Sequence, residues 1–174
     1  FSKLETELTD SKKKQKTKIT PFMQEVWEGF TRVDENKMLE DYKTSSFKKD
    51  ILNVAKSITS LPNTPFLRKI TKLFESREKL IFENGKVDWA MAELLAYGTL
   101  LNEGFNVRIS GQDVERGTFS HRHAVLKSED SEEEYLPLNN IDSINKGLFR
   151  IYNSPLSEYG VLGFDYGYAL ASPN

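Results

Sequence analysis

Residues 88–109 contain, in direct succession, a helix with an N-cap, a glycine and a segment in which apolar and polar residues alternate. This succession limits the possible folds more than any other part of the sequence. Asp88 is typical of a helix N-cap, and the apolar residues after it predict a helix from Trp89 to about Glu103. Gly104 is the expected end of that helix. Residues 105–109 alternate between apolar and polar side chains, which is typical of a strand. A helix followed at once by a strand predicts an α/β fold.

The chain divides near residue 85 into two regions of different character. Residues 1–85 begin with a polar arm and continue as helices separated by a break at residues 60–65. We interpret the lysine run of residues 12–18 as a solvated, partly disordered segment, not an anion-binding arm, because acidic residues precede it. The apolar positions of residues 66–74 predict a further helix, with Arg77 outside its apolar face. Residues 86–174 carry the α/β pattern.

The second region contains further strand and helix signals. Residues 123–126 and 149–152 are short strand candidates, and the acidic run between them predicts a solvated surface loop. Ser154 followed by Pro155 predicts a last helix from Pro155 to about Ala171. Three glycines fall at helical spacing on that helix, where each costs about 1 kcal/mol relative to alanine. They predict a smooth face that a backbone or a flat ligand approaches closely. These glycines are Gly160, Gly163 and Gly167.

Composition excludes several classes of protein. The chain has 174 residues, no cysteine and a net charge of −2. The missing cysteines exclude disulfide scaffolds, thiol catalysis and Cys-type zinc sites. The charge balance gives no basic field for nucleic acid or an anionic membrane, and no apolar run is long enough for a membrane span. Because the chain begins with Phe1 and has no signal-peptide pattern, we expect a segment of a larger protein.

Two places carry candidate chemistry. Glu158 lies in the first turn of the last predicted helix, either as a capping carboxylate at the third helical position or as a carboxylate that exchanges a proton with a ring nitrogen. Gln112 opens the polar loop after the predicted strand, a usual place for ligand contacts in α/β folds. Arg116 and Arg122 add positive charge to this loop, which suggests a substrate with a carboxylate.

The loop also contains a His-x-His pair, His121 and His123. On a strand both rings point to one face, which suits a metal ion, but no third ligand lies nearby in the sequence. We therefore expect polar contacts with an anionic substrate, or a structural role, and no metal site. The motifs of dinucleotide-binding, P-loop, α/β-hydrolase and zinc-protease sites are absent from the sequence.

Three segments carry a family resemblance: VDWAMAE at residues 87–93, ISGQDVERGTFSHRHAV at residues 109–125 and LSEYGVLGF at residues 156–164. The chain resembles the E1 component of the 2-oxoglutarate dehydrogenase complex, which depends on thiamine diphosphate. The resemblance is near-continuous over residues 86–174 and looser over residues 20–85. It implies that residues 86–174 are the front part of a pyrimidine-binding domain of the thiamine-diphosphate-binding fold. Residues 1–85 are then a polar arm and a mainly helical connection between domains.

The resemblance also implies roles for individual residues. Glu158 matches the glutamate that hydrogen-bonds the cofactor's aminopyrimidine ring nitrogen, and with Leu156 it is expected to contact the cofactor. Gln112 matches a polar residue that faces the substrate, and His121 and His123 match histidines at the substrate end, His123 with a catalytic role. Asp165 departs from the family, which usually has glutamate there. The ligands of the diphosphate and of Mg²⁺ are expected outside this chain.

The parent protein is thus expected to decarboxylate 2-oxoglutarate and to pass a succinyl group to the lipoyl domain of its E2 partner. Such an E1 is a homodimer and is found in the bacterial cytoplasm or the mitochondrial matrix. One alternative is an E1 for another 2-oxo acid, such as 2-oxoadipate. A second alternative is a fragment that is inactive alone and serves as an interaction module.

Overall fold

The computed structural model describes residues 1–13, 26–31, 33–144, 146–155 and 157–173. It contains two compact units, which are described separately: residues 41–163, and residues 1–40 together with 164–174. In the smaller unit α1 (Ser2–Lys13) has no buried residue, and η1 (Lys37–Leu39) is a short 3-10 turn. Of the lysine run at residues 12–18, Lys12 and Lys13 are exposed as expected but helical, not disordered, and residues 14–18 lie outside the described residues.

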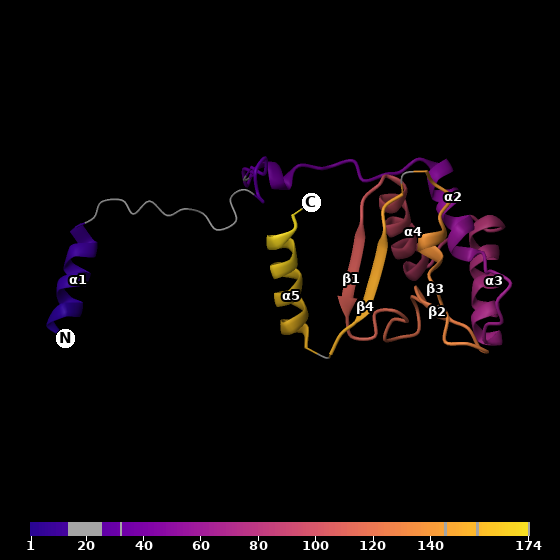
Figure 1. Cartoon of the computed structure of the whole chain (residues 1–174). Helices are drawn as coiled ribbons and strands as arrows, with labels where there is room; N and C mark the ends of the chain where they lie inside the picture. The colour runs from indigo at the N-terminus through magenta and orange to yellow at the C-terminus, as the bar shows by residue number, and fades with distance from the viewer. Residues whose placement is uncertain (14–25, 32, 145, 156, 174) are drawn as a thin grey trace. The chain divides into compact units, whose positions relative to one another are not determined.

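The larger unit is built on three helices and a pair of parallel strands (Figure 1). α2 (Lys48–Thr59) packs against both α3 (Arg68–Phe82) and α4 (Trp89–Asn102). The α2–α4 contact depends on Gly98, because a Cβ atom at this position would overlap the Val54 side chain. A glycine in a helix interior is destabilising by about 1 kcal/mol. Here it allows two helices to approach closely enough to share one core.

The strands β1 (Val107–Gly111) and β4 (Phe149–Asn153) pair in parallel, with Val107 opposite Phe149 and Gly111 opposite Asn153. A separate antiparallel pair is formed by β2 (Leu126–Lys127) and β3 (Glu134–Tyr135), and η2 (Pro137–Asn140) leads on from it. The main core joins α2, α4, η2 and the strand pair. Its largest fully buried members include Ile58, Met91, Leu101, Leu138, Ile141 and Phe149.

The helix–glycine–strand prediction is confirmed. The Asp88 carboxylate accepts a hydrogen bond from the Met91 amide at 2.7 Å, and Gly104 has a φ of +92° after the last turn. The strand begins two residues later than expected because Phe105 still belongs to the helix end, where its amide donates to the Leu100 carbonyl at 3.0 Å. That bond, with the one from Gly104 to Leu101, forms a Schellman motif.

Candidate active site

The carboxyl ends of β1 and β4 bring the predicted site segments to one edge of the parallel pair. Gly111 ends β1 and is followed by Gln112, while Asn153 ends β4 and is followed after five residues by Glu158. The Ser154 amide donates to the Gly111 carbonyl at 2.9 Å, so the pairing continues one step beyond the strands. Ligands of α/β folds commonly bind at this kind of edge. The fold therefore starts the Gln112 loop and the chain leading to Glu158 from adjacent positions.

A reciprocal pair of hydrogen bonds, which we call the Glu115–Asn153 clasp, ties the loop to the end of β4. The Glu115 amide donates to Asn153 Oδ1 at 3.2 Å, and the Asn153 amide donates to Glu115 Oε1 at 3.4 Å. These residues are 38 positions apart in the sequence. The clasp fixes where the loop lies relative to the strand that leads to Glu158.

The loop between β1 and β2 has an unusual backbone. Asp113, Ser120 and His123 have φ values of +50°, +53° and +50°, a region that non-glycine residues rarely occupy. Gly117 has a φ of +82°, and a Cβ atom there would lie 2.5 Å from the His121 ring. Such strain persists only where surrounding contacts hold it, and it concentrates at functional sites.

One of the two loop arginines is held within the loop itself. Arg116 forms an ion pair with Asp113, and its Nη1 donates to Ser120 Oγ at 3.1 Å. The hydrogen bond from Arg116 lowers the pKa of the Asp113 carboxyl. The guanidinium charge is thus already paired inside the loop.

The second loop arginine is held by α4. Arg122 makes a two-pronged ion pair with Glu93, with 3.2 Å between Nη2 and Oε2, and its Nη1 donates to the Val114 carbonyl at 2.7 Å. Both arginines are thus engaged by carboxylates of this chain, and the expectation that the loop receives a substrate with a carboxylate stays a prediction.

His123 is buried, and residues 123–125 are not a strand. The predicted strand begins only at Leu126, because the left-handed backbone at His123 interrupts an extended path. The ring lines a small closed cavity with Phe74, Leu94 and Leu138, and its Nε2 has no hydrogen-bond partner. Burial, followed by the charge of Arg77, lowers the pKa of His123. Both effects favour the neutral imidazole, and the Nε2 atom is buried without a hydrogen-bond partner.

The other two predicted residues of this loop differ in exposure. Gln112 is exposed directly after β1. His121 is partly buried and lies close to Gly117. The centroids of the His121 and Phe119 rings are 6.3 Å apart, and His121 Nδ1 has no hydrogen-bond partner. Because the His121 and His123 side chains do not lie on a common strand, the strand geometry that favoured a metal pair does not occur. The roles of Gln112 and His121 toward substrate stay predictions.

Glu158 is the first residue of α5 (Glu158–Ala171). The Gly160 amide donates to Ser157 Oγ at 3.1 Å, so Ser157 is the N-cap and the helix begins three residues later than Pro155. The expectation of a capping carboxylate at the third helical position is therefore wrong. The Glu158 side chain is exposed at the positive end of the helix dipole. Leu156 lies outside the described residues.

Arg77 is a functional candidate that the sequence reasoning missed. It was expected on the outer face of α3, but its side chain is only 3% exposed. Its Nη1 donates to the Arg122 carbonyl at 3.3 Å, and its Nη2 donates to the His121 carbonyl. The signal was present in the sequence, because Phe74, Arg77 and Ile81 follow helical spacing on one face.

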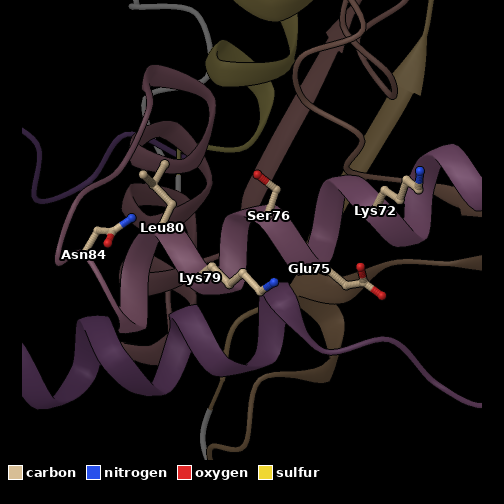
Figure 2. Close-up of a pocket in the computed structure, with 6 residues that line it drawn as sticks. All are labelled: Lys72, Glu75, Ser76, Lys79, Leu80 and Asn84. Carbon is tan, nitrogen blue, oxygen red and sulfur yellow. The ribbon is translucent and has the colours of Figure 1, made fainter.

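Two surface hollows lie away from these residues. One, of about 440 Å³, follows the outer face of α3, where Figure 2 shows Lys72, Glu75 and Lys79 projecting from successive turns. The other, of about 740 Å³, lies between residues 43–46 and the outer face of α4. Neither contains a predicted site residue.

The part of the chain that the structure describes lacks two kinds of feature, metal-binding clusters and membrane-spanning helices. No group of three or more histidine, aspartate or glutamate side chains is placed to hold a metal ion there. Among the helices described there, none combines the length and the apolar character that crossing a bilayer requires.

Comparison with known proteins relates the site to a family. Residues 85–174 match the family described as transketolase, pyrimidine binding domain. The chain is 44% identical to "2-oxoglutarate dehydrogenase, mitochondrial" of Schizosaccharomyces pombe over 168 residues, which are 95% of this chain and 17% of that protein. It is 40% identical to the "2-oxoglutarate dehydrogenase E1 component" of Rickettsia felis over 153 residues, 87% of this chain and 15% of that protein.

A third relative carries a name that refers to a different 2-oxo acid, 2-oxoadipate. The human "2-oxoadipate dehydrogenase complex component E1" is 52% identical over 99 residues, which are 57% of this chain and 11% of that protein. The chain therefore spans at most 17% of the length of these relatives.

Proposed function

Because the chain belongs to the family of transketolase pyrimidine-binding domains, we propose that it is a segment of the E1 component of a 2-oxoglutarate dehydrogenase. In this proposal residues 86–174 are the front part of the pyrimidine-binding domain, and residues 1–85 are an arm and a helical connection. The complete enzyme decarboxylates 2-oxoglutarate and transfers a succinyl group to E2. The observation that carries the proposal is that the chain leading to the exposed Glu158, at a helix start, leaves the same strand edge as the Gln112 loop.

The family depends on thiamine diphosphate, and the residues around Glu158 fit the pyrimidine half of this cofactor. The Glu158 carboxylate is exposed at the first position of α5, where it is free to accept a hydrogen bond from a protonated ring nitrogen. A Cβ atom at Gly163 would meet no described atom within 4 Å, so the helix face beyond Glu158 is open to a flat ring or a neighbouring chain. We expect the ligands of the diphosphate and Mg²⁺ outside this chain.

Bound thiamine diphosphate supplies the carbon nucleophile and the electron sink that decarboxylation needs. The chain's own contribution is then a small set of polar groups. Glu158 holds a proton at the ring nitrogen, and Leu156 is expected to contact the ring. We propose that Gln112, His121 and His123 act at the substrate end, with His123 as the catalytic histidine.

The proposal includes partners and a location. We expect an E1 homodimer that serves the lipoyl domain of the E2 dihydrolipoyl succinyltransferase. The exposed aromatic side chains of α5 suit a buried position in such an assembly, with Tyr159 90% exposed in the chain as described. The expected location is the mitochondrial matrix, or the cytoplasm in a bacterium, because the relatives are mitochondrial or bacterial proteins.

The experiment uses a complete E1 polypeptide that carries this segment. We expect 2-oxoglutarate-dependent reduction of an artificial electron acceptor only when thiamine diphosphate and Mg²⁺ are present. Glu158→Gln should lower turnover at least about 100-fold, because general acid–base groups contribute 10²- to 10⁴-fold. It should also slow hydrogen exchange at the cofactor's C2 atom. Glu103→Gln is the matched control, since Glu103 is an exposed glutamate at a helix end. Unchanged C2 exchange in Glu158→Gln would refute the assignment.

A specific observation supports a second substrate. The identity to the human 2-oxoadipate relative is 52% over 99 residues. Comparing turnover of 2-oxoglutarate and 2-oxoadipate by the same E1 decides between the two. An interaction module without activity of its own is the remaining alternative. Calorimetry on the 174-residue chain should then show weak or no binding of thiamine diphosphate, and micromolar binding would contradict this expectation.

A further inference from the structure

Arg77 lies in the middle of α3 on the face turned away from solvent. Residues 72, 75, 76 and 79 line the outer hollow of this helix (Figure 2), whereas Phe74, Arg77 and Ile81 form its buried face. The Arg77 guanidinium lies 5.7 Å from the centre of the Phe74 ring. A cation in this position gives up its hydration, so its presence needs a specific reason.

The contacts of Arg77 are with backbone, not with an acid. Its two terminal nitrogens donate to the consecutive carbonyls of His121 and Arg122. Among the ion pairs found in the described residues, none includes Arg77. Asp88 acts on the charge only through space, where it partly opposes the effect of burial, which lowers the pKa of Arg77. The planar fork of arginine suits two neighbouring acceptors, which the single ammonium of lysine does not match.

The two carbonyls that Arg77 holds lie between two strained residues. Ser120 and His123, on either side of them, both have left-handed backbone conformations. Such a conformation is costly for a residue other than glycine and persists only where surrounding contacts determine it. The hydrogen bonds from Arg77 reach the peptide groups between these residues. They therefore fix the path of the backbone that carries both histidines.

We propose that Arg77 is a positioning residue, which acts through the backbone of residues 121–123 to hold the histidine segment in its working geometry. The proposal deepens the function proposed above and rests on it for the reaction that the geometry serves. The Arg77 contacts themselves do not depend on that function.

The electrostatics of His123 agree with this role. The groups that lower the pKa of His123, after burial, are Arg77 and Lys69 from α3 and Arg116 from the loop. A hydrogen bond with the Ser120 backbone raises it, and since Nε2 has no partner, this bond is made by Nδ1. The side chains of Leu94 and Leu138 around the ring carry no charge. Arg77 thus orients the histidine backbone, and its charge adds to burial, the larger cause, in lowering the pKa of His123.

The first experiment measures the two histidines by NMR in the 174-residue chain. They are the only histidines present, so their ring signals are separable during a pH titration. Arg77→Met should raise the pKa of His123 toward 6.5, its value without perturbation. Arg77→Lys keeps the charge and should leave that pKa near the wild-type value, while the amide signals of residues 120–123 shift. Arg68→Met and Arg68→Lys are matched controls, since Arg68 is an exposed arginine of the same helix.

The second experiment measures kinetics in the complete E1. Arg77→Lys should lower kcat/KM for 2-oxoglutarate about 10- to 100-fold, the scale expected when reacting groups are misplaced by about 1 Å. Hydrogen exchange at the cofactor C2 atom should stay unchanged, because it depends on Glu158. A loss of thermal stability and of C2 exchange together would point to a general structural role instead, and would overturn the proposal.

The remaining outcomes are also decisive. Wild-type kcat/KM in Arg77→Lys, or unchanged amide signals of residues 120–123 in the same variant, would overturn the positioning role. If the complete E1 shows no turnover, the proposed function fails, and the histidine titration still decides on Arg77. If Arg77→Met does not fold, the wild-type chain is sufficient: separate, slowly exchanging Nη signals of Arg77 support the proposal, and one averaged signal refutes it.

Discussion

The two segments that leave the strand edge differ in how far their side chains are already engaged. In the loop of residues 112–123, Arg116 and Arg122 are paired with carboxylates and the carbonyls of residues 121 and 122 are held by Arg77. In α5 no residue is buried, and Glu158 is exposed at the first helical position. Both segments start from adjacent positions on β1 and β4.

This difference separates two ways to build a site. The loop is completed by contacts within the chain, so its geometry exists before any ligand binds. The start of α5 presents an exposed carboxylate, and a Cβ atom at Gly163 would meet no described atom within 4 Å, so this part of the helix is not shaped by close packing.

The largest effect is expected for Gly117→Ala. An added Cβ atom would lie 2.5 Å from the His121 ring, at a backbone φ of +82° that alanine adopts only with strain. The strain and the displaced ring together should lower the free energy of unfolding by roughly 2–4 kcal/mol. Urea denaturation measures this change. A loss below about 0.5 kcal/mol would show that the loop is not held as tightly as described.

The next effect concerns the ion pair between α4 and the loop. Glu93→Ala, Arg122→Ala and the double variant form a thermodynamic cycle. The Glu93 and Arg122 side chains are 30% and 14% exposed, so solvent screens the pair only in part. We expect a coupling energy of about 1–2 kcal/mol. Asp113 and Arg116, whose side chains are 29% and 53% exposed, provide the control cycle and should couple more weakly.

The third effect is a pH dependence of stability that comes from His123. Its pKa is lowered in the folded chain, first by burial, so the unfolded chain binds the proton first as the pH falls. The stabilising contribution is therefore complete above 6.5, the ordinary value, and is lost as the pH falls through the folded value. The slope reaches at most about 1.4 kcal/mol per pH unit. Urea denaturation between about pH 7.5 and 5 should show a shallower dependence in His123→Gln. Equal slopes would contradict the prediction.

The smallest effect has the opposite sign. Gly163→Ala in α5 places a Cβ atom where no described atom lies within 4 Å. It should therefore raise helix stability by about 0.5–1 kcal/mol, as expected for glycine to alanine in a helix interior. Thermal unfolding of the 174-residue chain measures this gain. A loss of stability would mean that this face already packs against part of the chain, and the contrast with Gly117 would fail.

Local signals made part of this fold predictable. The helix of residues 89–102 follows from Asp88 at its start and Gly104 at its end, because both residues act on the backbone within one turn. The prediction from Ser154 and Pro155 that α5 begins at residue 155 was wrong, because the helix begins at Glu158. Proline suits a first helical turn, but the hydroxyl of Ser157 satisfies the Gly160 amide and sets the start there.

The tertiary contacts of the site could not be predicted in the same way. Arg77 meets the His121 and Arg122 carbonyls across 44 and 45 positions, and Arg122 meets Glu93 across 29 positions. No local pattern specifies such pairs. The Arg116–Asp113 pair is different, because only three positions separate its two residues.

The Glu115–Asn153 clasp also makes the site insensitive to the length of the chain between its two residues. Within that span the turn between β2 and β3, residues 128–133, carries most of the acidic run; residues 129–133 are exposed, and the Glu129 amide ties the start of the turn to the Pro65 carbonyl at 2.8 Å. Exposed loop tips of this kind accept insertions, because lengthening a loop adds little to the cost of closing it. Proteins that share this fold are therefore free to vary in length at this turn while Glu115 and Asn153 keep the two halves of the site joined.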